Sequence, residues 1–149
     1  MRWILGTALA ATAAFSGPAL AQDCAATVSA NDAMQFVEKE LRISRSCTTF
    51  NLTLKHVGTL AANIMGHNWV LTATPDYMAV ATAGMTAGAA NNYMPPGDAR
   101  VLVASKVIGG GEETTISFDA SKLEAGGDYT YFCSFPGHFA LMSGKLIVE

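Results

Sequence analysis

The clearest alternation of hydrophobic and polar residues lies in residues 49–56, which read TFNLTLKH. Phe50, Leu52 and Leu54 occupy every second position, and polar residues fill the places between them. A period of two is typical of a β-strand that buries one face and exposes the other. The same parity places His56 on the buried face of this predicted strand.

Other short hydrophobic runs predict further strands, and turn sequences separate them. The runs are residues 68–72, 101–108, 114–118, 128–133 and 145–148, and the turns lie at 95–98, 109–111 and 126–128. Several short strands joined by turns favour an antiparallel β-sandwich or barrel. Trp69 and Tyr131 fall on inward positions of two of these strands, and a buried Tyr131 hydroxyl needs a hydrogen-bond partner.

Residues 75–88 break the strand pattern and predict one short helix. Thr74 is of the type that caps a helix N-terminus, and Pro75 suits the first helical position. Apolar residues follow at helical spacing, namely Met78, Ala81 and Met85.

The first 21 residues have the composition of a secretory signal peptide. Arg2 provides the positive start, an apolar run follows, and residues 19–21 (ALA) form a small-x-small cleavage site. An uncleaved membrane anchor is the alternative, but the apolar run is short for a bilayer and Gly17 and Pro18 interrupt it. We therefore expect cleavage after residue 21, leaving residues 22–149 as a single domain.

Composition narrows the class of protein. Half of the chain is hydrophobic, 14% is charged and the formal net charge is −3, which excludes an intrinsically disordered chain. Without a cluster of Lys and Arg, nucleic-acid binding is not expected. The long uncharged apolar stretch lies within the first 21 residues, so we expect no membrane association after the signal peptide is cleaved.

The cysteines suggest both a disulfide and a metal. The chain has three, Cys24, Cys47 and Cys133, and an exported protein meets an oxidising compartment in which thiols pair. Cys24 and Cys47 both lie in the N-terminal third and are the natural pair, worth roughly 3 kcal/mol in the chain-entropy model. Cys133 is then left over, and metal ligation would protect its thiol.

Residues 133–142 bring together donors of three chemical kinds. Cys133, His138 and Met142 offer a thiolate, an imidazole and a thioether, and His67 lies upstream beside a predicted strand. Structural zinc takes four strong ligands, and calcium or magnesium needs carboxylates, which this stretch lacks. Two His and one Cys with a weak axial Met form instead the blue-copper set, which favours one-electron transfer without bond making.

The motifs around these donors resemble the copper-binding segments of the cupredoxins, the small blue copper proteins. The matching stretches are residues 65–70 (MGHNWV), 131–138 (YFCSFPGH) and 140–142 (ALM), with four residues between Cys133 and His138. Plastocyanins and pseudoazurins have a shorter interval there. The resemblance extends to residues 31–36, the Cys24/Cys47 pair and residues 121–123, and so covers essentially the whole mature chain.

This resemblance implies a fold and a set of roles. The fold would be all-β, a Greek-key β-sandwich of about eight strands with one short helical flap near residues 75–88. Asn68 would fix the ligand loops, the Phe135 N–H would hydrogen-bond the Cys133 sulfur, and Cys24–Cys47 would be the family's disulfide. The copper ligands would be His67, Cys133 and His138, with Met142 and the Gly66 backbone carbonyl as weak axial ligands.

The resemblance also implies an apolar docking surface around the second histidine ligand. Its members would be Met34, Leu60, Ile64, Met65, Met85, Phe135, Ala140 and Leu141; the alternative is that these residues are simply buried. Such a surface suits brief contacts with redox proteins such as c-type cytochromes or periplasmic reductases and dehydrogenases. His56, if partly buried, could titrate near neutrality and couple to the copper potential.

The leading function is therefore a monomeric periplasmic carrier that cycles one copper ion between Cu(II) and Cu(I), and not an enzyme. One alternative is copper storage or delivery, which a carrier's retention of its metal would distinguish. Another is a thiol enzyme with Cys133 as nucleophile and His138 as base. The sequence offers this enzyme neither an oxyanion hole nor an orienting carboxylate.

Overall fold

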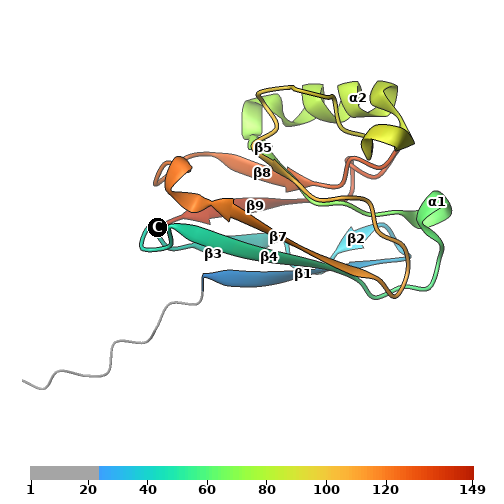
Figure 1. Ribbon diagram of the computed structural model, residues 1–149, viewed down its shortest axis with the longest axis horizontal. Helices are drawn as coiled ribbons and strands as arrows, with labels where there is room; N and C mark the ends of the chain where they lie inside the picture. The colour runs from blue at the N-terminus through green and yellow to red at the C-terminus, as the bar shows by residue number, and fades with distance from the viewer. Residues whose placement is uncertain (1–23) are drawn as a thin grey trace, which may run out of the picture.

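The computed structural model describes residues 24–149, so the expected signal peptide lies outside the described residues (Figure 1). The described chain forms nine strands. They are β1 (Ala25–Asn31), β2 (Gln35–Phe36), β3 (Glu40–Ile43), β4 (Thr49–His56), β5 (Val70–Ala73), β6 (Val103–Ala104), β7 (Glu113–Asp119), β8 (Tyr129–Phe132) and β9 (Ser143–Val148). The helical segments are α1 (Ala62–Met65), α2 (Tyr77–Ala87) and the 3-10 turns η1 (Thr74–Asp76), η2 (Ala89–Asn91) and η3 (Ala120–Lys122).

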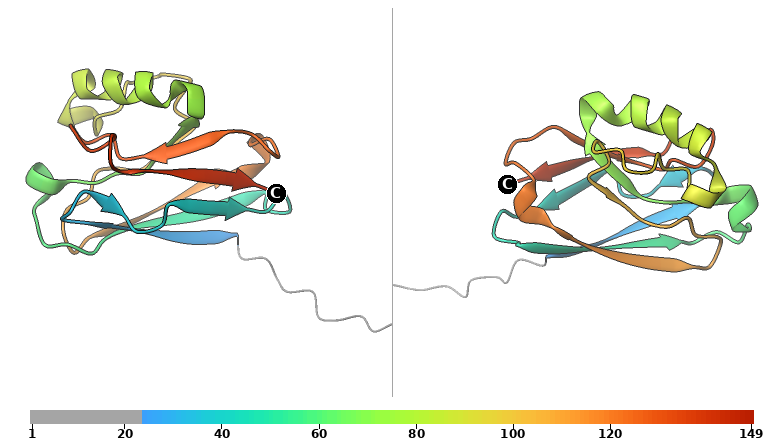
Figure 2. Two further views of the ribbon diagram at one scale, coloured as in Figure 1. Left: turned by 180° about the vertical axis from the view of Figure 1, so that it is seen from behind. Right: turned by 45° about the horizontal axis from the view of Figure 1, so that its top comes forward.

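The strands form two sheets, in the orders β2-β1-β4-β7 and β3-β9-β8-β5-β6. The chain passes repeatedly from one sheet to the other, which gives the expected Greek-key sandwich (Figures 1 and 2). The expectation of antiparallel sheets is wrong at two places, because β1 pairs with β4 and β3 with β9 in parallel. Alternation within a strand reports which face is buried and says nothing about the direction of its neighbour.

The main core lies between the two sheets. The alternation in β4 has its predicted bounds and burial, with Phe50, Leu52 and Leu54 at most 1% exposed. Trp69 is fully buried, as expected. Tyr131 is also buried, and its hydroxyl has the partner it needs, since it donates to the Glu38 carbonyl oxygen at 2.7 Å.

A second, smaller core lies between α2 and the outer face of β5 and β8 (Figure 1). Val80 and Ala81 of α2 pack there against Val70 and Phe132. The helix is thus where the sequence predicts it. Of the three apolar residues at helical spacing, Ala81 alone lies on the buried face of α2, because Met78 and Met85 are exposed.

The predicted N-cap of this helix is wrong. Thr74 is itself the first residue of η1, and the N-cap of α2 is Asp76, whose side chain makes no capping bond. The Thr74 hydroxyl instead donates to Asp128 Oδ1 at 2.8 Å. The hydroxyl that the local sequence predicts to cap the helix therefore bonds a residue 54 positions away instead.

Two strand predictions also need correction. Residues 101–108 do not form one strand, because β6 covers Val103–Ala104 alone and Ile108 makes an isolated bridge with His67. β1, β2 and β3 were not predicted. β1 reads AATVSAN, in which small polar and apolar residues hide the alternation.

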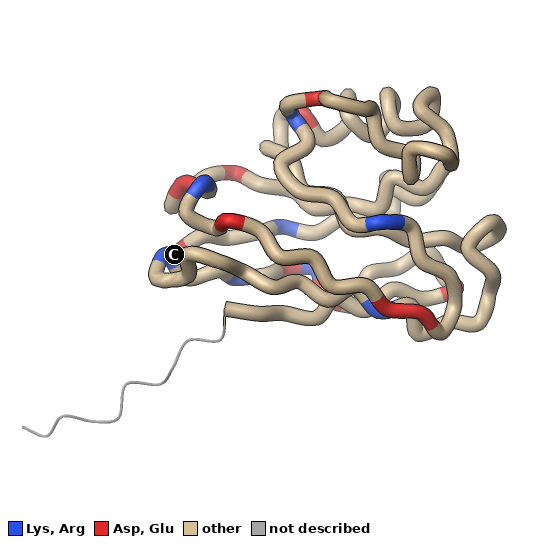
Figure 3. The backbone as a smooth tube through the Cα atoms, in the orientation of Figure 1, with Lys and Arg blue, Asp and Glu red and all other residues tan. Residues whose placement is uncertain are grey.

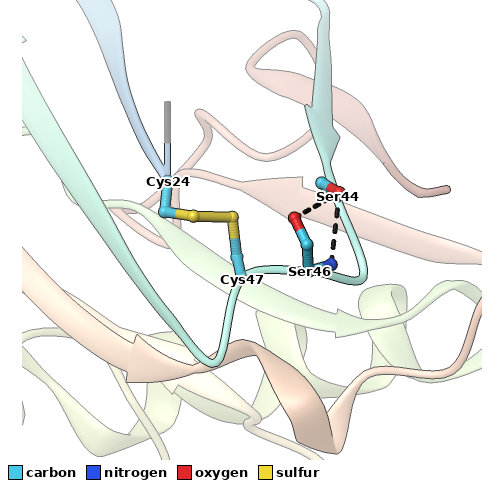
Figure 4. The surroundings of a disulfide bond; sticks show 4 residues. All are labelled: Cys24, Ser44, Ser46 and Cys47. Carbon is cyan, nitrogen blue, oxygen red and sulfur yellow. Dashed lines mark hydrogen bonds between the residues drawn. A yellow bond between two sulfur atoms is a disulfide. The ribbon is translucent and has the colours of Figure 1, made fainter. Parts of the chain in front are cut away.

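The disulfide between Cys24 and Cys47 is present, as expected (Figure 4). It joins the residue before β1 to the turn that follows β3, where Ser44 and Ser46 also hydrogen-bond to each other. This is the end of the sandwich at which β1 begins, and α1 lies at the opposite end (Figure 1). Within residues 24–149, no helix has the length and apolar character needed to cross a membrane.

Candidate metal centre

His67 enters the site from a short, tightly packed loop. The single turn α1 ends at Met65, Gly66 follows, and the His67 backbone pairs with Ile108 through bonds of 3.0 and 2.8 Å. The His67 Nε2–H donates to the Asn31 carbonyl oxygen at 2.9 Å. This bond fixes the tautomer and leaves Nδ1 free of its proton and available to a metal.

Gly66 is the residue that this loop requires. A Cβ there would lie 2.6 Å from Val107 Cγ1 and 3.0 Å from the Phe135 ring, and it would also meet the Ala62 carbonyl oxygen. Any side chain would therefore push His67 away from the second ligand loop. The close approach sets the position of the first imidazole before a metal binds.

Cys133 and His138 share the second loop, which directly follows β8 and closes on itself. His138 N–H donates to the Phe135 carbonyl oxygen at 3.0 Å, and Met142 N–H donates to the His138 carbonyl oxygen at 2.8 Å. The Cys133 N–H then donates to the Met142 carbonyl oxygen at 3.0 Å. The loop is thus held by its own backbone, with Met142 fully buried beneath it.

Three of the sequence-derived ligands meet in one place. Cys133 Sγ lies 3.8 Å from His67 Nδ1 and 3.6 Å from His138 Nδ1, and all three ligand atoms are within 4.8 Å of one another. A single ion bound at roughly 2.0–2.3 Å to each atom needs separations of about this size. Two imidazoles and one soft thiolate form the donor set that copper favours, so the residues fit the metal that the sequence suggests.

The remaining sequence-derived residues lie beside this cluster. The Gly66 carbonyl oxygen is 3.9 Å from Cys133 Sγ. Backbone N–H groups of Asn68 and Phe135 donate to the Cys133 sulfur. Both bonds favour a charged sulfur, and such bonds tune a metal-bound thiolate.

Burial governs the protonation of the metal-free site. It raises the pKa of the Cys133 thiol to about 12, against the opposing effect of the two N–H donors. Burial likewise lowers the pKa of His67 to about 4, and it lowers the pKa of His138. Near neutrality the site therefore holds a thiol and two neutral imidazoles, and metal binding releases the thiol proton.

The same values argue against the thiol enzyme. A catalytic cysteine needs a lowered pKa and access to its substrate. Cys133 is fully buried and the pKa of its thiol is raised. The His138 ring lies close to the sulfur but does not convert this buried thiol into a nucleophile.

Asn68 joins the two ligand loops through its side chain. Its Oδ1 accepts from the Ser134 N–H at 2.8 Å, and its Nδ2 donates to the Ser134 hydroxyl at 2.8 Å. The same Nδ2 also donates to the Asn92 carbonyl oxygen at 3.1 Å. Sequence reasoning missed both Ser134 and Asn92, because their contacts depend on segments that are distant in the chain.

The residues expected on the docking surface divide into three groups. Leu60, Ile64, Met85, Ala140 and Leu141 are exposed, and Met34 and Met65 are half-buried. Phe135 does not belong to an exposed surface, because it is 9% exposed. Its ring lies 4.7 Å from that of His138 and 5.1 Å from that of Tyr93.

His56 is buried on the inward face of β4, as the alternation predicts, and stacks on His67 with ring centroids 4.4 Å apart. Its Nε2–H donates to the Met65 carbonyl oxygen at 2.8 Å, and its Nδ1 accepts from the Gly58 N–H at 3.0 Å. Both ring nitrogens thus have hydrogen-bond partners. His56 therefore helps to fix the position of the loop that carries His67, through its bond to Met65 and its stacking on the His67 ring.

Comparison with known proteins places these features in a family. The profile of a family described as "Copper binding proteins, plastocyanin/azurin family" matches residues 22–149. The azurin of Bordetella pertussis is 53% identical over 138 residues, which cover 93% of this chain and 92% of that protein. Azurin-1 of Alcaligenes xylosoxydans xylosoxydans is 56% identical over 124 residues, covering 83% of this chain and 96% of the relative.

A solved structure agrees with these relatives. It is an azurin (Az-iso2) from Methylomonas sp. strain J, with a TM-score of 0.82 and 42% sequence identity. The match covers 86% of this chain and 99% of that one.

Proposed function

The chain belongs to the plastocyanin/azurin family of copper-binding proteins and has the His–Cys–His site of a blue copper electron-transfer protein, and on that premise we propose that it shuttles single electrons between redox proteins of the periplasm. The observation that carries the proposal is the buried convergence of His67, Cys133 and His138 on one metal position. We further propose that residues 1–21 are removed on export and that residues 22–149 act alone, as a monomer.

Bound copper would supply a reversible one-electron couple between Cu(II) and Cu(I). His67, Cys133 and His138 would hold it as strong ligands, and the buried Met142 and the Gly66 carbonyl would be the weak axial ligands. The Asn68 and Phe135 N–H groups would stabilise the charge on the sulfur. We propose these roles for the five ligand residues and for the two N–H donors.

The chain's own contribution is rigidity. His67 is held by Asn31 and Ile108, and the Cys133–Met142 loop by its internal backbone bonds, before any metal is present. Ligands that are already in place have little distance to move when the charge on the metal changes. A small rearrangement on electron transfer is what a fast carrier needs.

Burial supports a carrier in preference to an enzyme. His67 and Cys133 are fully buried and His138 is 3% exposed, so a substrate has no access to a metal held by them. An electron, in contrast, needs only a short covalent and contact path to the surface. We propose that His138 provides that path, because the same loop carries Ala140 and Leu141, which are exposed.

We propose the exposed apolar residues around this histidine as the docking surface, with Leu60, Ile64, Met85, Ala140 and Leu141 outermost. The segments 57–66, 77–97 and 129–144 contain no Asp, Glu, Lys or Arg. In Figure 3, α2 and the loop that follows β8 accordingly appear without charged positions. A small uncharged surface suits short-lived contact with several partners, here c-type cytochromes or periplasmic reductases and dehydrogenases.

Two experiments test the proposed function. Adding Cu(II) to the metal-free protein should give an intense blue absorption, and stopped-flow mixing with a c-type cytochrome should show rapid one-electron exchange. A colourless product would contradict the site. A blue protein that transfers its copper to a chelator or partner faster than it exchanges electrons would instead indicate copper delivery.

A further inference from the structure

Asn92 has an unusual backbone conformation close to the metal centre. It follows η2 with φ 52° and ψ 32°, which is the left-handed region. Asparagine enters this region more readily than most residues, whereas alanine and larger side chains are disfavoured there. The conformation directs the Asn92 carbonyl group inward, toward the loops that carry the metal ligands.

That carbonyl oxygen contacts both ligand loops. It accepts a hydrogen bond from Asn68 Nδ2 at 3.1 Å and one from the Ser134 hydroxyl at 3.4 Å. Asn68 directly follows His67, and Ser134 directly follows Cys133. Because Asn68 Nδ2 also donates to Ser134 Oγ, both of its hydrogens have acceptors and the three groups form a closed set.

The side chain of Asn92 reaches a third segment. Its Oδ1 accepts from the Val107 N–H at 2.9 Å. Val107 precedes Ile108, which pairs with the His67 backbone, and Val107 Cγ1 would lie 2.6 Å from a Cβ on Gly66. One residue therefore binds the three segments that set the positions of His67 and Cys133.

Asn92 is itself anchored to the helical flap. Its N–H donates to the Ala89 carbonyl oxygen at 2.9 Å, and the next N–H, that of Tyr93, donates to Gly88 at 3.0 Å. The Tyr93 carbonyl oxygen lies against Gly84 of α2, where any side chain would collide with it. The turn that contains Asn92 and Tyr93 thus connects α2, which packs on the sheet, to the ligand loops.

We propose that Asn92 is a positioning residue that locks the two copper-ligand loops to each other and to α2. It touches no ligand atom and acts through Asn68, Ser134 and Val107. Its role is to keep the loops in one arrangement as the metal gains and loses an electron. This inference rests on the proposed electron-transfer function, which it extends from the ligands to the flap.

The test compares three variants. Asn92→Ala removes the side-chain acceptor and disfavours the left-handed backbone, whereas Asn92→Gly removes the acceptor but keeps the backbone and its carbonyl. Asn91→Ala is the matched control, because the Asn91 side chain also makes one hydrogen bond to the backbone, donated by its Nδ2 to the Ala87 carbonyl oxygen in the same turn.

The first measurement uses metal-free protein, so it does not depend on copper. NMR-detected exchange of the Asn68 side-chain amide hydrogens should be about tenfold faster in Asn92→Ala, as loss of one buried hydrogen bond would give. The increase should be smaller in Asn92→Gly and absent in Asn91→Ala. Unfolding of all three variants is followed in parallel, so that a general loss of stability is recognised.

The second measurement is the electron self-exchange rate of the copper-loaded variants. It should fall several-fold in Asn92→Ala, less in Asn92→Gly and not at all in Asn91→Ala. If Asn92→Ala retains both the wild-type exchange protection and the wild-type rate, the inference is wrong. If the wild type itself fails to bind copper, the proposed function fails, and the amide-exchange result still decides whether Asn92 locks the loops.

Discussion

The two ends of the sandwich are held together by different means. At one end, the disulfide between Cys24 and Cys47 fixes the start of β1 covalently, and Arg42 of β3 forms an ion pair with Glu149 at 2.8 Å. At the other end, the metal ligands lie on loops that hydrogen bonds and close glycine contacts hold in place.

This difference separates stability from function. A covalent link acts mainly by restricting the unfolded chain. The disulfide should therefore contribute to the free energy of unfolding whether or not the metal site is intact. The hydrogen bonds at the metal end hold specific atoms at specific distances, and their loss moves ligands. Changes at the first end should therefore alter stability at constant spectroscopic properties, whereas changes at the second should alter the spectroscopic properties, with or without an effect on stability.

The largest expected effect is that of Cys133→Ser. The variant should lose the blue absorption completely, because the charge transfer that gives the colour comes from the thiolate. Its metal-free form should still fold, with the free energy of unfolding changed by about 1–2 kcal/mol, since the serine oxygen can accept the same N–H bonds. Visible absorption after Cu(II) addition and urea unfolding measure the two quantities; a blue variant would contradict the ligand assignment.

Removing the disulfide by Cys24→Ser with Cys47→Ser tests the opposite end. The free energy of unfolding should fall by about 3 kcal/mol, as expected for release of a loop of this length. The copper absorption and reduction potential should stay as in the wild type. A shift in the potential as large as that of a metal-end variant would show that the two ends are not independent.

Acid should destabilise the metal-free protein through its metal end. The unfolded chain protonates His67 at its ordinary pKa near 6.5, whereas burial keeps the pKa of folded His67 at about 4. The unfolded state therefore takes up the proton first, and stability falls as pH decreases from 6.5 to 4, by about 2–3 kcal/mol. Urea unfolding at a series of pH values measures this slope.

His67→Gln provides the control for the pH series, because glutamine does not titrate. It should flatten the profile between pH 6.5 and 4, leaving the smaller contribution of His138, whose pKa is also lowered by burial. An unchanged profile would place the acid sensitivity elsewhere in the molecule.

The smallest expected effect is that of Arg42→Ala near the disulfide. Arg42 pairs with Glu40 and Glu149, but its side chain is 55% exposed. Exposed ion pairs contribute less than about 1 kcal/mol and are weakened by salt. The thermal midpoint should therefore drop slightly at low ionic strength, with no change at high salt and none in the copper absorption.

Local patterns predicted the parts of the molecule that are determined locally. Strand β4 follows from its own alternation, and the Cys–His–Met spacing of the second ligand loop follows from a stretch of ten residues. His67 was predicted from its setting between Gly66 and Asn68 and its family resemblance. These predictions needed no knowledge of which segments meet.

The predictions that failed depend on long-range contacts. Thr74 does not cap α2, and its hydroxyl bonds Asp128 instead; Phe135 is buried in contact with Tyr93 and His138, residues from elsewhere in the chain and from its own loop. The parallel pairing of β1 with β4 depends on how the chain crosses between sheets, which no single strand encodes. Asn92 was missed for the same reason, since nothing in its own neighbourhood marks it as a neighbour of Asn68.

The position of β9 has a consequence for biosynthesis. This strand, the last of the described chain, lies in the interior of its sheet between β3 and β8, and it pairs with residues about a hundred positions earlier. Until the ribosome has released residues 143–148, the sheet has a gap where β9 belongs, and the loop containing His138 and Met142 is open on one side. The native metal pocket is therefore completed only after β9 has been synthesised and has paired with β3 and β8, and such distant contacts form slowly.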